Sequence, residues 1–264
     1  MREFLLQSIP YLILLIMAAA IYYLSLRISW AFSLSKWLVT AIIGVLTIGA
    51  FVLMMVIMRG NYTSTMSHLL SNISNILIGV LMFAVCITLL IDLIGLFVKL
   101  QPRTFGFIAL GATTLLSAYS LWNASHTRVY EIDITLPNLV EPLRIAHLSD
   151  THFGHFWGES KAQELADIIK ANEVDLIVIT GDMFDGRVRL NSNVIKPFTE
   201  LGIPTYFSEG NHDGYSGSQD IKRLLTENGI TVLANEKAEF RGLQIIGLDY
   251  LLPDNNSVDN FHGA

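Results

Sequence analysis

Three short motifs in the second half of the sequence combine carboxylate, imidazole and amide side chains. They are Asp150-Thr-His152, Gly181-Asp182 and Gly210-Asn211-His212-Asp213. Carboxylate, imidazole and amide oxygen together suit a divalent ion such as Mn²⁺, Fe²⁺ or Zn²⁺. The glycines let the backbone turn sharply beside the ligands and leave room for a phosphate. A lone Asp-x-His or Gly-Asp is common by accident, but all three motifs in order favour a metal centre.

Each motif follows an apolar run that is typical of a β-strand. These runs lie within residues 143–150, 175–182 and 204–213, and helical spacing occupies residues 161–173 and 193–202 between them. Alternation of strand and helix predicts right-handed crossovers and a largely parallel or mixed sheet. Ligands of such sheets gather at the carboxyl ends of the strands. We therefore expect the three motifs to meet at one edge of the sheet.

The flanking sequence continues the α/β pattern. Residues 129–137 alternate apolar and polar side chains, as a half-exposed strand does. Residues 218–229 predict a helix that ends at Gly229, and short strands are expected in residues 231–235, 238–242 and 243–250.

The first 127 residues differ sharply from this pattern. They carry a net charge of +4, so the remainder carries −10 of the total of −6. Four apolar runs, residues 4–26, 36–58, 73–98 and 104–122, are near or above the ~20 residues that a helix needs to cross ~30 Å of hydrocarbon. They have almost no polar face, which argues against buried helices of a soluble domain. The sequence predicts a membrane anchor with four transmembrane helices in residues 1–127 and a second domain in residues 128–264.

Charges near the spans predict an orientation. The loops 27–36 and 99–103 hold four positive charges. By the positive-inside tendency they are cytoplasmic, and the second domain lies on the outer face of the cell membrane. Asp92 lies in the third run, where a carboxylate is a candidate functional group. The alternative is that Asp92 lies close enough to the membrane–water interface for its carboxylate to reach it. We expect no ionisable partner for Asp92 deep in another span.

The motif series SDTH, TGDMFD and EGNHD resembles the calcineurin-like metallophosphoesterases. These are two-metal phosphomonoesterases and phosphodiesterases on a four-layered αββα sandwich with mixed sheets. The likeness covers roughly residues 143–250, and a four-span anchor before such a domain is similar to the membrane-bound bacterial branch. The resemblance implies a metal-dependent phosphoesterase, in the first place a phosphodiesterase. Its partners would be the lipid bilayer and a phosphate-ester substrate, with lipid-linked phosphates as candidates, and we expect no nucleic-acid partner.

The resemblance also implies a set of metal ligands. Asp150 and His152 resemble the ligands of the first metal, and Asp182 looks like the carboxylate that bridges two divalent ions (Mn, Fe or Zn). Asn211 resembles a ligand of the second metal that also contacts the phosphate. Two ions about 3.5–4 Å apart would bind a bridging hydroxide that attacks phosphorus in line. Their charge would allow an acidic domain to take an anionic substrate.

Two further residues are implied to be catalytic. His212 resembles the active-site histidine that stabilises the phosphoryl oxygens or protonates the leaving group, and Asp213 would hold its imidazole in one tautomer. The role of Asp185 stays open between two alternatives. It either supports the site through another residue or caps its own turn. His147 is expected to be a satisfied core histidine, and His155 either touches substrate or lies in a solvated loop.

A complete domain of this family has two more motifs, a histidine after a strand and a Gly-His-x-His turn. Neither occurs before Ala264, and His262 follows a polar stretch instead of a strand, which argues against it as a substitute. We therefore expect an incomplete α/β domain in a fragment of a longer enzyme, inactive by itself. The alternative is a catalytically inactive, truncated membrane protein that retains a degenerate binding half-domain.

Overall fold

A computed structural model describes residues 2–60, 65–136, 139, 141–154, 156–185 and 192–250. The chain forms two compact units. The first contains Met1–Ile57 and Leu69–Arg128, and the second contains Met58–His68 and Val129–Ala264.

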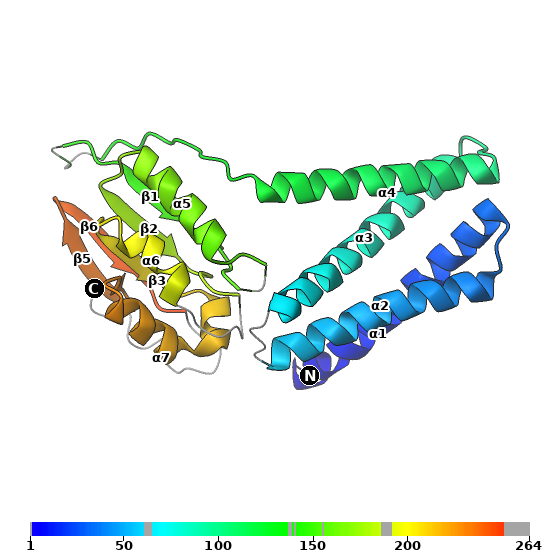
Figure 1. The fold of residues 1–264 in the computed structure, drawn as a ribbon, viewed down its shortest axis with the longest axis horizontal. Coiled ribbons are helices and arrows are strands. Elements are labelled where there is room, and N and C mark those ends of the chain that lie inside the picture. The colour runs from blue at the N-terminus through cyan, green and yellow to red at the C-terminus, as the bar shows by residue number, and fades with distance from the viewer. Residues whose placement is uncertain are drawn as a thin grey trace. The chain divides into compact units, whose positions relative to one another are not determined.

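Four long helices account for most of the first unit (Figure 1). They are α1 (Arg2–Phe32), α2 (Lys36–Gly60), α3 (Thr65–Gly95) and α4 (Pro102–Ser125). Within them, four segments are long and apolar enough to cross a membrane: Tyr11–Phe32, Lys36–Ile57, Met66–Gly95 and Pro102–Ser125. Each exceeds the ~20 residues that a span requires. The four-span region that the sequence predicts is confirmed.

Asp92 has a charged partner within these helices. Tyr23 Oη donates to Asp92 Oδ2 over 2.6 Å, and Arg27 Nε donates to the same oxygen over 2.7 Å. The Arg27 guanidinium also lies 5.7 Å from the ring centroids of Trp30 and Phe105. The expectation that Asp92 lacks an ionisable partner is wrong, because α1 continues past Arg27 and brings this residue against α3. Pairing greatly lowers the cost of placing a charge in apolar surroundings.

The second unit contains a parallel sheet of four strands in the order β1-β2-β3-β4 (Figure 1). The strands are β1 (Ile145–Leu148), β2 (Leu176–Thr180), β3 (Thr205–Ser208) and β4 (Thr231–Val232). The connections contain α5 (Glu159–Ala171), the 3-10 helix η1 (Ser192–Val194), α6 (Lys196–Thr199) and α7 (Asn211–Glu227). A separate antiparallel pair is formed by β5 (Glu236–Phe240) and β6 (Leu243–Gly247). The α/β fold with a parallel sheet is confirmed.

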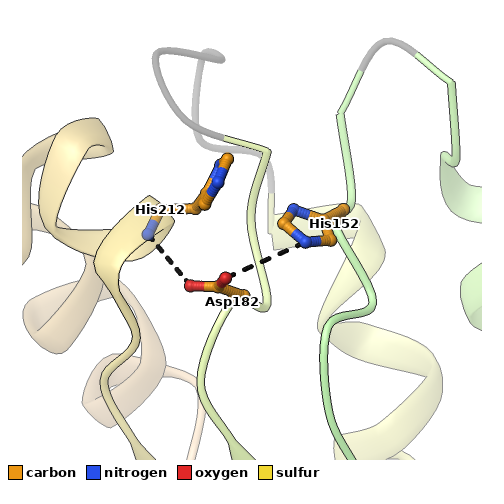
Figure 2. Close-up of side chains that lie close together, drawn as sticks. All are labelled: His152, Asp182 and His212. Carbon is orange, nitrogen blue, oxygen red and sulfur yellow. Dashed lines mark hydrogen bonds and ion pairs between the residues drawn. The ribbon is translucent and has the colours of Figure 1, made fainter.

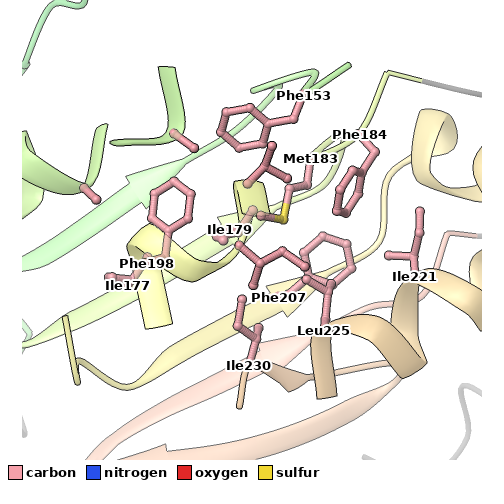
Figure 3. Close-up of a cluster of buried hydrophobic side chains, with 14 of the residues drawn as sticks. Phe153, Ile177, Ile179, Met183, Phe184, Phe198, Phe207, Ile221, Leu225 and Ile230 are labelled. Carbon is pink, nitrogen blue, oxygen red and sulfur yellow. The ribbon is translucent and has the colours of Figure 1, made fainter. Parts of the chain in front are cut away.

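The core of this unit lies between the helices and one face of the parallel sheet (Figure 3). Its fully buried side chains include Phe153, Ile177, Met183, Phe198, Phe207 and Leu225. Phe153 directly follows His152, and Met183 directly follows Asp182. Burial of these two apolar neighbours anchors the loops that carry the first two motifs.

Two expected elements differ in the structure. Residues 129–136 are not a strand, and the side chains of Tyr130, Ile132 and Ile134 are 76–79% exposed. Alternation alone cannot make a strand, because its backbone N–H and C=O groups need a paired neighbour, and no described strand pairs with this segment. The helix expected from residue 218 follows a break at Gly217, and an additional helical segment of α7 precedes it from Asn211. The third motif therefore lies on the first turn of α7.

Candidate metal centre

The loops after β1 and β2 remain paired beyond the ends of the strands. The backbone N–H of Asp150 donates to the carbonyl of Gly181 over 3.2 Å, and that of His152 donates to the carbonyl of Asp182 over 3.0 Å. These bonds continue the parallel pairing into the first two motifs. The expected meeting of these motifs at the carboxyl edge of the sheet is confirmed.

Three candidate ligands have a left-handed backbone conformation. The φ angle is +54° at Asp150, +45° at His152 and +52° at Asp182. Residues other than glycine seldom adopt this region, and each instance costs on the order of 1 kcal/mol or more. Such strain persists only where the surroundings impose it, and it is concentrated at functional sites. Here the inter-loop hydrogen bonds and the buried neighbours impose it.

Two glycines allow the second and third motifs to touch. Gly181 has a φ of +78°, and a Cβ built on it would lie 2.9 Å from the Cα of Gly210. A Cβ built on Gly210 would lie 2.5 Å from the backbone nitrogen of Asp182 and would overlap its carboxylate. Any side chain at either position would push the loops after β2 and β3 apart. This contact explains why glycine precedes both Asp182 and Asn211.

His152, Asp182 and His212 converge from the loops after β1 and β2 and the first turn of α7 (Figure 2). Each residue offers one ligand atom, and these atoms all lie within 4.8 Å of one another. His152 Nε2 lies 3.9 Å from Asp182 Oδ2 and 4.0 Å from Asp150 Oδ1. The two imidazole rings meet edge to face, with centroids 4.7 Å apart.

These donors fit a divalent cation. Metal–ligand bonds of about 2.0–2.2 Å place two ligands of one ion at most about 4.4 Å apart. The separations of 3.9 and 4.0 Å at His152 Nε2 meet this limit. Among the described residues, no lysine or arginine forms an ion pair with Asp150, Asp182 or Asp185. Their negative charges are thus concentrated beside two imidazoles, a combination that attracts Mn²⁺, Fe²⁺ or Zn²⁺.

The first turn of α7 faces Asp182 with its backbone. The N–H of His212 donates to Asp182 Oδ1 over 2.9 Å, which orients the carboxylate (Figure 2). A helix N-terminus carries partial positive charge and favours an anion nearby. Asn211 lies half-buried on the same turn, and its role as a ligand stays a prediction.

Asp213 is fully buried and binds backbone groups with both of its oxygens. Its Oδ1 accepts the N–H of Phe184 and its Oδ2 accepts the N–H of Gly210, each over 3.0 Å. Burial raises the pKa of Asp213 above its usual value, although these N–H donors act in the opposite direction. The carboxylate therefore joins the loop after β2 to the start of α7. Its expected support of the His212 ring stays a prediction.

Asp185 faces both imidazoles. Its Oδ1 lies 3.9 Å from Nδ1 of His152 and 4.0 Å from Nδ1 of His212. The backbone N–H of Asp185 donates to the carbonyl of Phe153 over 3.0 Å, which places the residue opposite the first motif. Of the two readings left open by the sequence, this geometry favours support of the site.

His147 does not join the cluster of His152, Asp182 and His212. His147 is exposed, with Nε2 2.7 Å from Thr180 Oγ1. The expectation that it lies in the core is wrong, because the core packs on the opposite face of β1, through Ala146 and Leu148. His155 and His262 lie outside the described residues.

Comparison with known proteins decides the family. Residues 143–263 match the calcineurin-like phosphoesterases. These residues belong to that family. A transmembrane protein with a metallophosphoesterase domain from Danio rerio is 33% identical over 141 residues, covering 50% of this chain and 32% of the relative. A Bos taurus protein with the same description is 30% identical over 138 residues, covering 49% of this chain and 31% of the relative.

A bacterial relative extends the comparison. An uncharacterised metallophosphoesterase from Campylobacter jejuni is 29% identical over 133 residues, covering 49% of this chain and 36% of the relative. The chain thus spans about a third of the length of these relatives. The family uses divalent metals, and its hydrolase chemistry agrees with the donor set of the phosphoesterase domain. The four apolar helices and the transmembrane relatives indicate a multi-pass membrane protein.

Proposed function

We propose that the phosphoesterase domain hydrolyses a phosphate ester, in the first place a diester, with two divalent ions. The convergence of His152, Asp182 and His212 within 4.8 Å carries this proposal. Asp150 and His152 would hold the first ion, Asn211 would hold the second, and Asp182 would bridge them. Ions bound there supply positive charge to the phosphoryl group and lower the pKa of a nucleophilic water.

The protein groups around the ions have distinct tasks. The backbone N–H of His212 fixes the orientation of Asp182, and the N-terminus of α7 favours the anionic phosphate. The His212 side chain is 39% exposed, so it can reach a substrate and donate a proton to the leaving oxygen. Asp185, 4.0 Å from Nδ1 of His212, would stabilise the protonated imidazole.

Because the chain has membrane helices, the favoured class of substrate is a phosphate ester at the bilayer surface. Phospholipid head groups and lipid-linked phosphates present a phosphate ester at that level. Lys36, Lys99 and Arg103 lie at or between the ends of the spans, and by the positive-inside tendency they favour an outer location for the domain at the cell membrane.

The test is hydrolysis of bis(4-nitrophenyl) phosphate and 4-nitrophenyl phosphate by the full-length protein in detergent. We expect activity that EDTA removes and Mn²⁺ restores, with the diester preferred. Asp182→Asn should lower kcat/KM by more than about 100-fold. Loss of a residue that only supports a metal ligand costs up to about 100-fold, and loss of a bridging ligand should cost more. The control is Asp167→Asn, an exposed carboxylate on α5. Protein that binds Mn²⁺ but hydrolyses neither ester would contradict the proposal and favour an inactive membrane protein.

A further inference from the structure

A buried carboxylate precedes the third motif and is held by a lysine on α7. Glu209 is only 5% exposed, and its Oε2 accepts Lys222 Nζ over 2.9 Å and Ser218 Oγ over 2.9 Å. The same Lys222 Nζ lies 2.8 Å from Oδ1 of Asp249, which follows β6. This Glu209–Lys222–Asp249 network joins the end of β3, the body of α7 and the chain that leaves the second sheet.

The network spans a break in α7. Gly217 has φ +106° and ψ 85°, so the helix is interrupted there. Regular helical bonding therefore does not hold the first turn, with Asn211 and His212, rigidly to the rest of α7. Ser218 and Lys222 lie after the break, whereas Glu209 lies before the first turn.

The position of Glu209 determines the position of the third motif. The next residue, Gly210, packs against Asp182 with no room for a Cβ. Its N–H is held by Asp213 over 3.0 Å. A displacement of Glu209 therefore moves Gly210 and, with it, the turn that carries His212.

We propose that the Glu209–Lys222–Asp249 network is a positioning device that holds Asn211 and His212 against Asp182. This inference rests on the proposed function, because the residues it positions are the proposed metal ligand Asn211 and the proposed proton donor His212. It makes Lys222 a positioning residue that does not itself touch the metal or the substrate.

The charges of the network depend on one another. Burial raises the pKa of Glu209, and the hydrogen bond from Lys222 acts in the opposite direction. Burial lowers the pKa of Lys222, but hydrogen bonds to Asp249 and Glu209 outweigh this and keep it above its usual value. Removal of the ammonium would leave two facing carboxylates without a cation, and an uncompensated buried charge is strongly unfavourable.

The adjacent residue provides a matched control. Arg223 lies 2.7 Å from Asp220, but these side chains are 68% and 62% exposed. Exposed pairs of this kind contribute little. Lys222→Met and Arg223→Met therefore each remove one positive charge, at adjacent positions of α7. Only Lys222→Met removes a charge from the Glu209–Lys222–Asp249 network.

The experiment measures Mn²⁺ affinity by electron paramagnetic resonance and kcat and KM for the aryl phosphodiester, in the full-length protein. We expect Lys222→Met to weaken Mn²⁺ binding about 10- to 100-fold, the range for residues that support metal ligands. It should lower kcat more than it raises KM. Arg223→Met should match the wild type, and Lys222→Arg should recover most of the loss.

Wild-type Mn²⁺ affinity and kcat in Lys222→Met would overturn the positioning role. If the wild type binds Mn²⁺ without hydrolysis, the proposed function fails, and the Mn²⁺ affinities of the variants still decide the positioning role. A wild type that binds no Mn²⁺ would overturn both. If Lys222→Met does not fold, the same measurements are made on the double variant Glu209→Gln with Lys222→Met, in which both side chains are uncharged. Weak Mn²⁺ binding in that variant supports the role, and wild-type binding refutes it.

Discussion

Gly210 packs so tightly against Asp182 that a Cβ built on it would lie 2.5 Å from the backbone nitrogen of Asp182. It fixes the distance between the bridging carboxylate and the turn that carries His212. The same position bears the N–H that Asp213 accepts over 3.0 Å. A single added methyl group should therefore affect both the packing of these loops and the metal centre.

We expect Gly210→Ala to lower the free energy of unfolding by about 1–3 kcal/mol, the usual cost of overpacking a tight site. Mn²⁺ should raise the Tm of the wild type, because a ligand that binds only the folded state stabilises it. It should not raise that of Gly210→Ala. Gly158→Ala is the control, since a Cβ there meets no atom within 4 Å and φ is −121°. Wild-type stability and an unchanged Mn²⁺ shift in Gly210→Ala would contradict this account of the site.

Much of the metal centre could be predicted from residue types, but its strain could not, and the sequence left the role of Asp185 open. Motifs at strand ends indicated where Asp150, His152 and Asp182 would meet. Their left-handed conformations could not be predicted, because aspartate and histidine usually adopt other backbone regions. The place of Asp185 depends on its backbone bond to Phe153, a contact between loops that are distant in the sequence.

At the scale of helices, the interaction of α1 with α3 depends on an ion pair. Arg27 Nη2 lies 2.7 Å from Asp92 Oδ2, and Tyr23 donates to the same oxygen. These charges lie in segments apolar enough to span a membrane. Loss of one partner leaves the other charge unpaired, whereas loss of both leaves an apolar contact.

We expect Asp92→Leu alone to destabilise the helical unit by up to about 3 kcal/mol, the scale of an unpaired charge within a span. The double variant Arg27→Leu with Asp92→Leu should recover most of that loss. The measurement is the temperature at which the detergent-solubilised protein loses its monodisperse peak in size-exclusion chromatography. A single variant as stable as the wild type, or a double variant less stable than the single, would show that the pair does not hold α1 to α3.

The extent of several elements depends on partners that the sequence does not reveal. A charge ends an apolar run in the sequence, so the first span was expected to stop before Arg27, yet α1 continues to Phe32 because Asp92 neutralises that charge. Residues 129–136 have the alternation of a strand but no described partner to pair with. The Gly-Asn-His-Asp motif was expected at the end of a strand, whereas Asp213 accepts the N–H of Gly210 and starts α7 there.

At the scale of the whole molecule, one chain combines four membrane-spanning candidates with a calcineurin-like phosphoesterase domain. The metal centre is the feature on which its proposed chemistry depends. Carboxylates gathered without a lysine or arginine partner among the described residues would repel one another, and a divalent cation removes that repulsion. Metal binding should thus be a property of the intact fold.

The most direct test is anomalous diffraction from crystals of the full-length protein grown with Mn²⁺. We expect an anomalous peak beside Asp150, His152 and Asp182, with a second peak on the Asn211 side of Asp182. Neither peak should appear in Asp182→Asn. Mn²⁺ bound only elsewhere, with the three side chains still converging, would contradict the assignment of this cluster as the metal centre.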